Sequence, residues 1–391
     1  MIIKSYMIMK KTILMTALIA AASVMSSCGQ KDTAPAEGSR TGFAISFFKN
    51  VNDVVRSSEN IVVSPYSAGV ALSMLEEGAG GETKAEFDNA LNSCLFKAEE
   101  FATGDKVVVR SANSVWISDD FSVRNHYVDL LQKDYDALVT TQNFSDPATL
   151  HAINNWCSEN TDGKIKGILD RISPNTVMIL ANALYFNASW ESRFDANLTR
   201  EQVFHGGDGD GKVKMMSRKG RYNYVEYQGA QMIELPYSGG TYAMYVVLPP
   251  DGMAMDKIIP YINESMFDSA LQNMESVEVR FKMPRMKLET SMSLNSVLKN
   301  MGVQTAFGPA ADFSGIAAMG PLVLSEVNQK CYIDVTENGT EAAAVTSAQI
   351  QLTSVRPELD VKTMTVDRPF IFFIADRNTS DILFAGKIVN L

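Results

Sequence analysis

The sequence predicts an α+β fold in which mainly antiparallel sheets are combined with a helical region. Helical periodicity is clearest in the first third of the chain, whereas strand-like runs dominate from about residue 175 onward. Few long helices lie between those runs, so the strands are expected to pair directly rather than through helical crossovers. The chain has 391 residues, 46% of them hydrophobic and 20% charged, which suits one large globular domain or two ordinary ones.

Three helices are expected in the first 160 residues or so. The first carries an apolar stripe along one face, made of Ala44, Phe47, Phe48, Val51, Val54 and Val55. The second begins at Ser64-Pro65, because Ser can cap a helix and Pro suits its first turn, and it ends at the glycines of 78–81. The third covers 151–160 and is ended by Asp162-Gly163.

Strands are expected where β-branched and aromatic residues cluster. These runs are 176–186, 242–249, 277–283, 322–335 and 370–375. The last run is apolar on both faces, which predicts a fully buried strand.

The N-terminus is interpreted as a targeting segment. Lys10 and Lys11 precede the apolar run 12–22, which is too short to span a bilayer comfortably. Residues 25–28, MSSC, resemble a bacterial lipobox in which Met replaces the usual Leu. This resemblance implies a signal peptide over 1–27, cleavage before Cys28 and acylation of its thiol.

The lipobox places the protein in the bacterial cell envelope, anchored by lipid to the outer membrane and facing the periplasm or the exterior. An ordinary secretory signal is the alternative, and the protein would then be secreted. Residues 28–40 are rich in small and polar side chains and predict a flexible tether. The folded domain is expected over 41–391.

Composition excludes several functions. The net charge is −10 and the basic residues form no cluster, which argues against nucleic acid as a partner. Cys94, Cys157 and Cys331 lack the spacing of a disulfide framework or a metal site, and they are expected to be buried thiols. Residues 206–212, GGDGDGK, resemble a calcium loop, but the ligand pattern fails and a hairpin turn is expected.

No catalytic constellation can be found. The three histidines, His126, His151 and His205, stand outside any HExxH or Gly-x-Ser-x-Gly context. The sequence also lacks a CxxC pair, a P-loop and a dinucleotide-binding fingerprint. It therefore predicts neither an enzyme nor a metal or cofactor site.

The segment 337–350, ENGTEAAAVTSAQI, is the most informative part of the chain. Read with period two, one face is small and mildly apolar and the other is more polar. The small face consists of Thr340, Ala342, Ala344, Thr346, Ala348 and Ile350. By itself this pattern suits a loop, a short helix or a half-buried strand.

Nine strings of residues resemble the serpin family and follow one another in family order. They are NIVVSPYS (60–67), ALSMLEEGAGGET (71–83), ANSVWI (112–117), INNWCSENTDGKI (153–165), NALYFNASW (182–190), ELPY (234–237), ADFSG (311–315), ENGTEAAA (337–344) and DRPF (367–370). The resemblance covers roughly residues 41 to 391. It implies a monomer with three sheets, eight to nine helices and an exposed reactive-centre loop.

The resemblance also implies inhibition of serine endopeptidases, and in some cases cysteine endopeptidases. The target protease cleaves the loop and forms a covalent acyl complex; the cut loop then inserts into the central sheet and the protease is trapped before deacylation. The inhibitor is thus a suicide substrate that supplies no catalytic group. The alternative is a non-inhibitory binding protein of the same fold, which proteases cleave as a plain substrate.

The family assigns roles to several positions. The hinge, which inserts first, comprises Glu337, Gly339, Thr340, Glu341, Ala342, Ala343 and Ala344, with Gly339 as the pivot. Trp190 matches the breach, where insertion begins, while Ser64, Ser67 and Asn182 match the shutter, which controls opening of the sheet. Gln329 stands where many animal serpins have a histidine. Glu337 is expected to pair with Lys282 or Lys287.

The scissile bond is predicted between Thr353 and Ser354 by counting from Glu337. Counting back from Pro369 gives positions from Val355 to Glu358, of which Val355 and Arg356 are kept as alternatives. Lys362 is a further candidate that is expected to lie in the strand leaving the loop. The sequence IQLTSV (350–355) favours an elastase- or subtilisin-like protease over a trypsin-like one.

Overall fold

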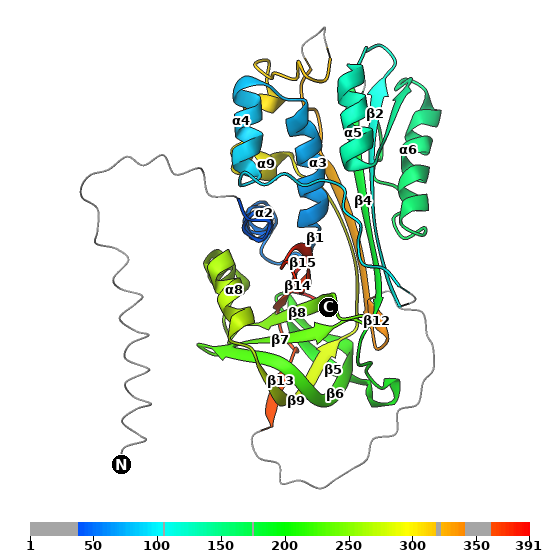
Figure 1. The fold of residues 1–391 in the computed structure, drawn as a ribbon. Helices are drawn as coiled ribbons and strands as arrows, with labels where there is room; N and C mark the ends of the chain where they lie inside the picture. The colour runs from blue at the N-terminus through cyan, green and yellow to red at the C-terminus, as the bar shows by residue number, and fades with distance from the viewer. Residues whose placement is uncertain (1–37, 105, 174–175, 318–321, 341–360) are drawn as a thin grey trace, which may run out of the picture. The chain divides into compact units, whose positions relative to one another are not determined.

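The computed structural model describes residues 38–104, 106–173, 176–317, 322–340 and 361–391 (Figure 1). The first helix, α2 (Arg40–Val54), is capped by Ser39, whose hydroxyl accepts a hydrogen bond from the Gly42 amide at 3.1 Å. The described structure therefore begins slightly before residue 41. Of the apolar face predicted for this helix, Ala44, Phe47, Phe48 and Val51 are buried, whereas Val54 is exposed and Val55, which caps the helix, is only partly buried.

Eight α-helices lie in the described residues, as the family resemblance implies. They are α2, α3 (Pro65–Glu77), α4 (Gly81–Ala90), α5 (Asn125–Tyr135), α6 (Pro147–Asn160), α7 (Met255–Ile258), α8 (Glu264–Gln272) and α9 (Asn295–Asn300). Helix α3 starts at the predicted Ser-Pro pair and is buried along almost its whole length. Helix α6 ends, as expected, where Asp162 and Gly163 take positive φ values of 48° and 73°.

A six-stranded sheet forms one half of the fold. Its order is β10 (Met286–Ser293), β11 (Asn328–Thr336), β12 (Gly339–Thr340), β4 (Met178–Ser189), β2 (Val107–Ser118) and β3 (Ala137–Gln142). Alternate residues of β4 face the main core and a second apolar cluster beneath α6. Helices α3 and α6 thus lie on opposite faces of this sheet (Figure 1).

The second sheet contains nine strands. Its order is β1 (Ile61–Val63), β15 (Ile382–Ile388), β14 (Phe370–Asp376), β8 (Tyr242–Leu248), β7 (Ala230–Pro236), β6 (Gly209–Tyr227), β9 (Glu275–Pro284) and β13 (Lys362–Thr365), with β5 (Arg200–Gly206) paired to β6. The 19-residue strand β6 pairs with β5, β9 and β7 in turn. Two of the three expected sheets therefore share one continuous ladder in the described residues.

Several local predictions are confirmed. Strand β14 is buried on both faces, Cys94, Cys157 and Cys331 are buried free thiols, and β5 and β6 form the hairpin expected near 206–212. The run 322–335 is only partly a strand, because β11 begins at Asn328. Within the described residues, no helix has the length and apolar character needed to cross a membrane.

Candidate functional site: the hinge between two strands

The candidate site is the point where β12 lies between β11 and β4. The chain turns back after β11 and pairs antiparallel with it, so that Gly339 lies opposite Thr336 and Thr340 opposite Val335. On its other side β12 pairs antiparallel with β4, at Ser189 and Ala188. This two-residue strand is the element that joins β11 to β4 in the described part of the chain.

Only glycine fits position 339 in this geometry. Its φ is 150°, and a Cβ atom added there would lie 2.0 Å from the carbonyl oxygen of Ala188. The backbone of β12 can therefore approach β4 only because position 339 has no side chain. This agrees with the pivot role that the family pattern gives to Gly339.

Thr340 points into the core and has a hydrogen-bond partner there. It is 1% exposed, and its hydroxyl lies 2.6 Å from the phenol oxygen of Tyr237. Tyr237 is itself buried and stacks on Trp190, with ring centroids 4.5 Å apart. Burial raises the pKa of Tyr237, so the phenol stays protonated and able to donate.

Trp190 holds the turn that precedes β12. Its indole nitrogen donates to the carbonyl oxygen of Thr336 at 2.9 Å, and its backbone amide donates to Asn338 at 2.8 Å. Trp190 therefore contacts the chain at the point where β12 enters the sheet, as its assignment to the breach implies. Tyr237, the last residue of the ELPY string, is part of the same site, although no role was predicted for it.

Glu337 pairs with Arg285, not with Lys282 or Lys287, so the predicted partners are wrong. The guanidinium of Arg285 binds the carboxylate at 2.7 and 2.8 Å, and the hydroxyl of Thr199 also donates to it. Burial by itself raises the pKa of Glu337, but the hydrogen bonds from Arg285 and Thr199 outweigh burial and lower it. Glu337 is thus held as a carboxylate beside the entry of β12.

The predicted shutter residues form a buried polar network between α3 and the sheet. The side chain of Gln329 accepts from the Ser64 amide at 3.1 Å and donates to the Ser64 carbonyl at 2.8 Å. The Ser67 hydroxyl donates to Asn182, whose amide donates to Asn113. Asn113, which was not predicted, extends the network to β2.

Comparison with known proteins agrees with this geometry. The family model described as serpin (serine protease inhibitor) matches residues 39–391. The chain belongs to the serpin family.

An uncharacterized serpin-like protein of Thermococcus kodakarensis is 34% identical to this serpin, over 88% of this chain and 83% of the relative. Leukocyte elastase inhibitor of Sus scrofa is 31% identical, over 89% of this chain and 97% of that protein. The crystal structure of tengpin, a thermophilic serpin in its native state, superposes with a TM-score of 0.83 at 30% identity, covering 95% of this chain and 97% of tengpin. Serpins are generally protease inhibitors rather than enzymes.

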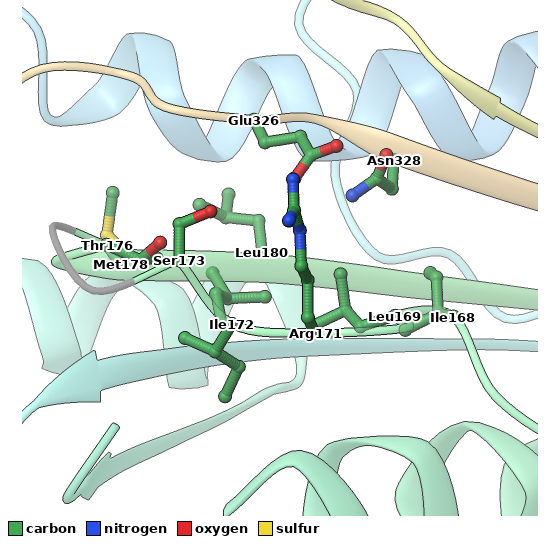
Figure 2. A pocket seen from close by; sticks show the side chains of 11 residues that line it. Ile168, Leu169, Arg171, Ile172, Ser173, Thr176, Met178, Leu180, Glu326 and Asn328 are labelled. Carbon is green, nitrogen blue, oxygen red and sulfur yellow. The ribbon is translucent and has the colours of Figure 1, made fainter. Parts of the chain in front are cut away.

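Within the described residues, β12 is the only strand pairing that joins β4 to β11, and we call the space between these two strands beyond β12 the gap. A small cavity lies at the end of the gap farthest from β12, where both strands of this serpin begin. Leu180 of β4 and Asn328 of β11 line it, together with the side chains of Arg171 and Glu326 (Figure 2). Its volume is about 20 Å³, which is room for about one water molecule. The gap therefore extends from β12 at one end to this cavity at the other.

Several predicted residues lie outside the described part of this serpin. They are Cys28, Glu341, Ala342, Ala343, Ala344, Thr353, Ser354, Val355 and Arg356. Lys362 is described and opens β13, as expected; it pairs in parallel with β9, and its ammonium group lies 3.5 Å from Glu226.

Proposed function

We propose that this serpin inhibits a serine endopeptidase as a suicide substrate, by cleavage of the reactive loop and insertion of the cut loop between β4 and β11. The proposal rests on the way in which β12 pairs within the sheet. Its two residues already pair with both neighbouring strands, and Thr340 finds a partner for its hydroxyl inside the core. Insertion of the cut loop would therefore lengthen a strand that already exists in the sheet.

The register of β12 indicates what extension would require. Continued after cleavage, the same register brings Ala342 between Phe186 and Ile333, which are both buried in the main core. A small side chain suits this place, since a charge there would be buried without a partner, at several kcal/mol. The hinge sequence therefore favours rapid insertion.

Further along, the same register brings Thr346 between Asn182 and Gln329. These are buried side chains of the shutter network, and a threonine hydroxyl can bond to either amide. The inserting residue that reaches the polar shutter is thus itself polar. We take this match as support for insertion along the whole gap.

A covalent complex tests the proposal against the alternative of a non-inhibitory binding protein. Incubation with elastase is expected to give an SDS-stable band, whereas a plain substrate gives only cut protein. Thr340→Arg should abolish the band, because the guanidinium would enter a buried site without a counter-charge. Thr141→Arg, at an exposed position of β3, is the control and should leave the band intact. A band that persists in Thr340→Arg rules out the insertion argument.

We propose Thr353-Ser354 as the scissile bond and an elastase- or subtilisin-like enzyme as the target. The similarity to a leukocyte elastase inhibitor supports this class of protease. Lys362 suits cleavage less well, since it lies in a hydrogen-bonded strand. Mass spectrometry of the C-terminal peptide released from the complex decides the bond. A peptide beginning at Arg356 would have been cut after Val355, one beginning at Pro357 after Arg356, and one beginning at Thr363 after Lys362. Each of these results excludes Thr353.

We also propose that acylated Cys28 holds the domain on the bacterial outer membrane through the tether 28–40. The lipobox-like MSSC sequence supports this location. Cys28→Ala should move the protein from the membrane fraction to the soluble fraction. An unchanged distribution would exclude the anchor without affecting the inhibitory mechanism.

A further inference from the structure

Asn338 lies in the turn between β11 and β12. The turn consists of Glu337 and Asn338, and Gly339 then opens β12. The main chain of Asn338 is fixed, because its carbonyl oxygen accepts a hydrogen bond from the Trp190 backbone amide at 2.8 Å. Its side chain is partly exposed, and among the described residues none shares a hydrogen bond with its carboxamide. The turn therefore depends on the main chain of Asn338 but makes no use of its amide group.

Asn338 and Gly339 form the only Asn-Gly pair in the sequence. Asparagine is a thermally labile residue, and it is most labile before glycine, because no Cβ atom hinders the approach to the glycine nitrogen. Glycine cannot be replaced here, since a Cβ atom at position 339 would lie 2.0 Å from the carbonyl oxygen of Ala188. The pairing of β12 with β4 thus imposes the glycine, and the residue at position 338 decides whether this peptide bond is labile.

We propose that Asn338 deamidates spontaneously and that the isoaspartate formed at this position disables the hinge. The backbone nitrogen of Gly339 loses its proton and attacks Cγ of Asn338. The bond from Cγ to the side-chain nitrogen then breaks, and ammonia leaves with the proton that Gly339 gave up. Water opens the resulting cyclic imide at either carbonyl, which gives aspartate or isoaspartate. One water molecule is consumed and one ammonia is released, with no oxidation or reduction.

Isoaspartate changes the main chain at the entry of β12. The chain then runs through Cβ and Cγ and gains one carbon–carbon bond of about 1.5 Å, while the carbonyl group that Trp190 binds becomes a carboxylate outside the main chain. β12 has only two residues, Gly339 and Thr340, opposite Ser189 and Ala188, so it has no length over which to absorb the shift. The hinge loses its register, and the cut loop cannot follow it into the sheet. The modification thus limits the working lifetime of the inhibitor, a consequence that rests on the proposed function.

Peptide mapping of the aged protein measures the modification itself. A lysine-specific protease releases the peptide 331–362, in which Asn338 is the only asparagine. Isoaspartate, detected by enzymatic methylation, should accumulate in this peptide, and faster at pH 8 than at pH 6 because the attacking nitrogen must lose its proton. Asn378 is the internal control. It lies in an exposed turn but precedes the β-branched Thr379, and it should keep its amide.

The yield of the covalent complex with elastase measures the consequence. In the aged wild type it should fall by the same fraction of molecules that carry isoaspartate at position 338. Asn338→Gln is the matched control, because it keeps an amide but must close a larger ring, and its yield should hold during ageing. Fresh Asn338→Asp should match the fresh wild type, which separates the added charge from the lengthened main chain.

Three results would overturn the proposal: Asn338 keeps its amide at pH 8 as long as Asn378 does, the aged wild type keeps its yield despite isoaspartate, or Asn338→Gln declines at the same rate. A fresh protein that forms no complex with elastase would reject inhibition instead. Insertion can then be followed by the rise in melting temperature after a metalloprotease cuts the loop. This rise should be smaller in the aged wild type than in aged Asn338→Gln, and an equal rise would overturn the effect on the hinge.

Discussion

At the scale of single residues, Thr340 combines two properties that insertion needs. Its side chain is small enough to lie inside the core, and its hydroxyl is satisfied there by Tyr237. A buried hydroxyl without a partner destabilises a protein, whereas a paired one contributes a modest net stabilisation. The threonine can thus leave water without leaving an unsatisfied group behind.

The contact between Thr340 and Tyr237 can be measured by a double-mutant cycle. Tyr237→Phe leaves the Thr340 hydroxyl buried without its partner and should lower the free energy of unfolding by about 1–3 kcal/mol. Thr340→Val likewise leaves the Tyr237 phenol buried without its partner. The double variant should lose less free energy of unfolding than the sum of the two single losses. Urea unfolding gives the values, with the exposed Tyr227→Phe as the control. Strict additivity would show that the two hydroxyls do not interact.

Because Glu337 is held as a carboxylate in the folded protein, we expect the stability to depend on pH. Its pKa is lowered in the folded protein, so the unfolded chain binds its proton more readily. The stabilisation is therefore complete above the ordinary pKa of a glutamate and is lost as the pH falls through the lower, folded value. In thermal melts, Glu337→Gln should be less stable than the wild type at pH 7, and this difference should shrink toward pH 3. A constant difference would mean that the charge of Glu337 contributes nothing.

At the scale of elements, periodicity and capping identified the helices and most strands. Ser64-Pro65 set the start of α3, and the doubly apolar run gave the buried strand β14. The strand predicted over 322–335 is longer than the observed one, because Leu322, Leu324 and Val327 are buried without belonging to a strand. An apolar pattern reports burial and cannot by itself separate a buried loop from a buried strand.

Ion-pair partners could not be predicted from the sequence, because they depend on register. Lys282 lies within β9 opposite Ser217, and Lys287 lies within β10 opposite Asp334. Arg285 stands between these strands, its amide bonded to the Lys214 carbonyl, and from there its guanidinium reaches Glu337. Tyr237 was missed for a similar reason, since only the three-dimensional arrangement brings the end of β7 beside β12.

The hydrogen bonds between Gln329 of β11 and Ser64, at the start of α3, can be tested by placing a titratable residue at position 329. Gln329→His can keep the bond from the Ser64 amide while the imidazole is neutral, because one ring nitrogen then accepts. Protonation removes the acceptor. The folded protein therefore favours the neutral ring, and stability should fall as the pH drops below about 6.5. Urea unfolding between pH 8 and 5.5 should show this loss in Gln329→His beyond any in the wild type; parallel profiles would argue against the link.

At the scale of the whole molecule, the six-stranded sheet is interrupted along part of its length. The shutter network and β12 each connect the strands on either side of that interruption. Nine weak strings in one order identified this fold from sequence, whereas no single string could have done so. The gap itself could not be predicted, because it is a property of how β4 and β11 are held and not of any one segment.

Cleavage of the loop should make the whole molecule more stable. A metalloprotease forms no acyl-enzyme, so it can cut the loop without being trapped. The freed segment after Thr340 can then complete the sheet, adding backbone hydrogen bonds to β4 and β11 and burying small apolar side chains. The melting temperature of the cut protein should therefore lie well above that of the intact one. In Ala342→Arg the rise should be much smaller, since the register of β12, once extended, brings this side chain between the buried Phe186 and Ile333. An equal or lower melting temperature after cleavage of the wild type would mean that the loop does not insert and that β12 is a fixed end of the sheet.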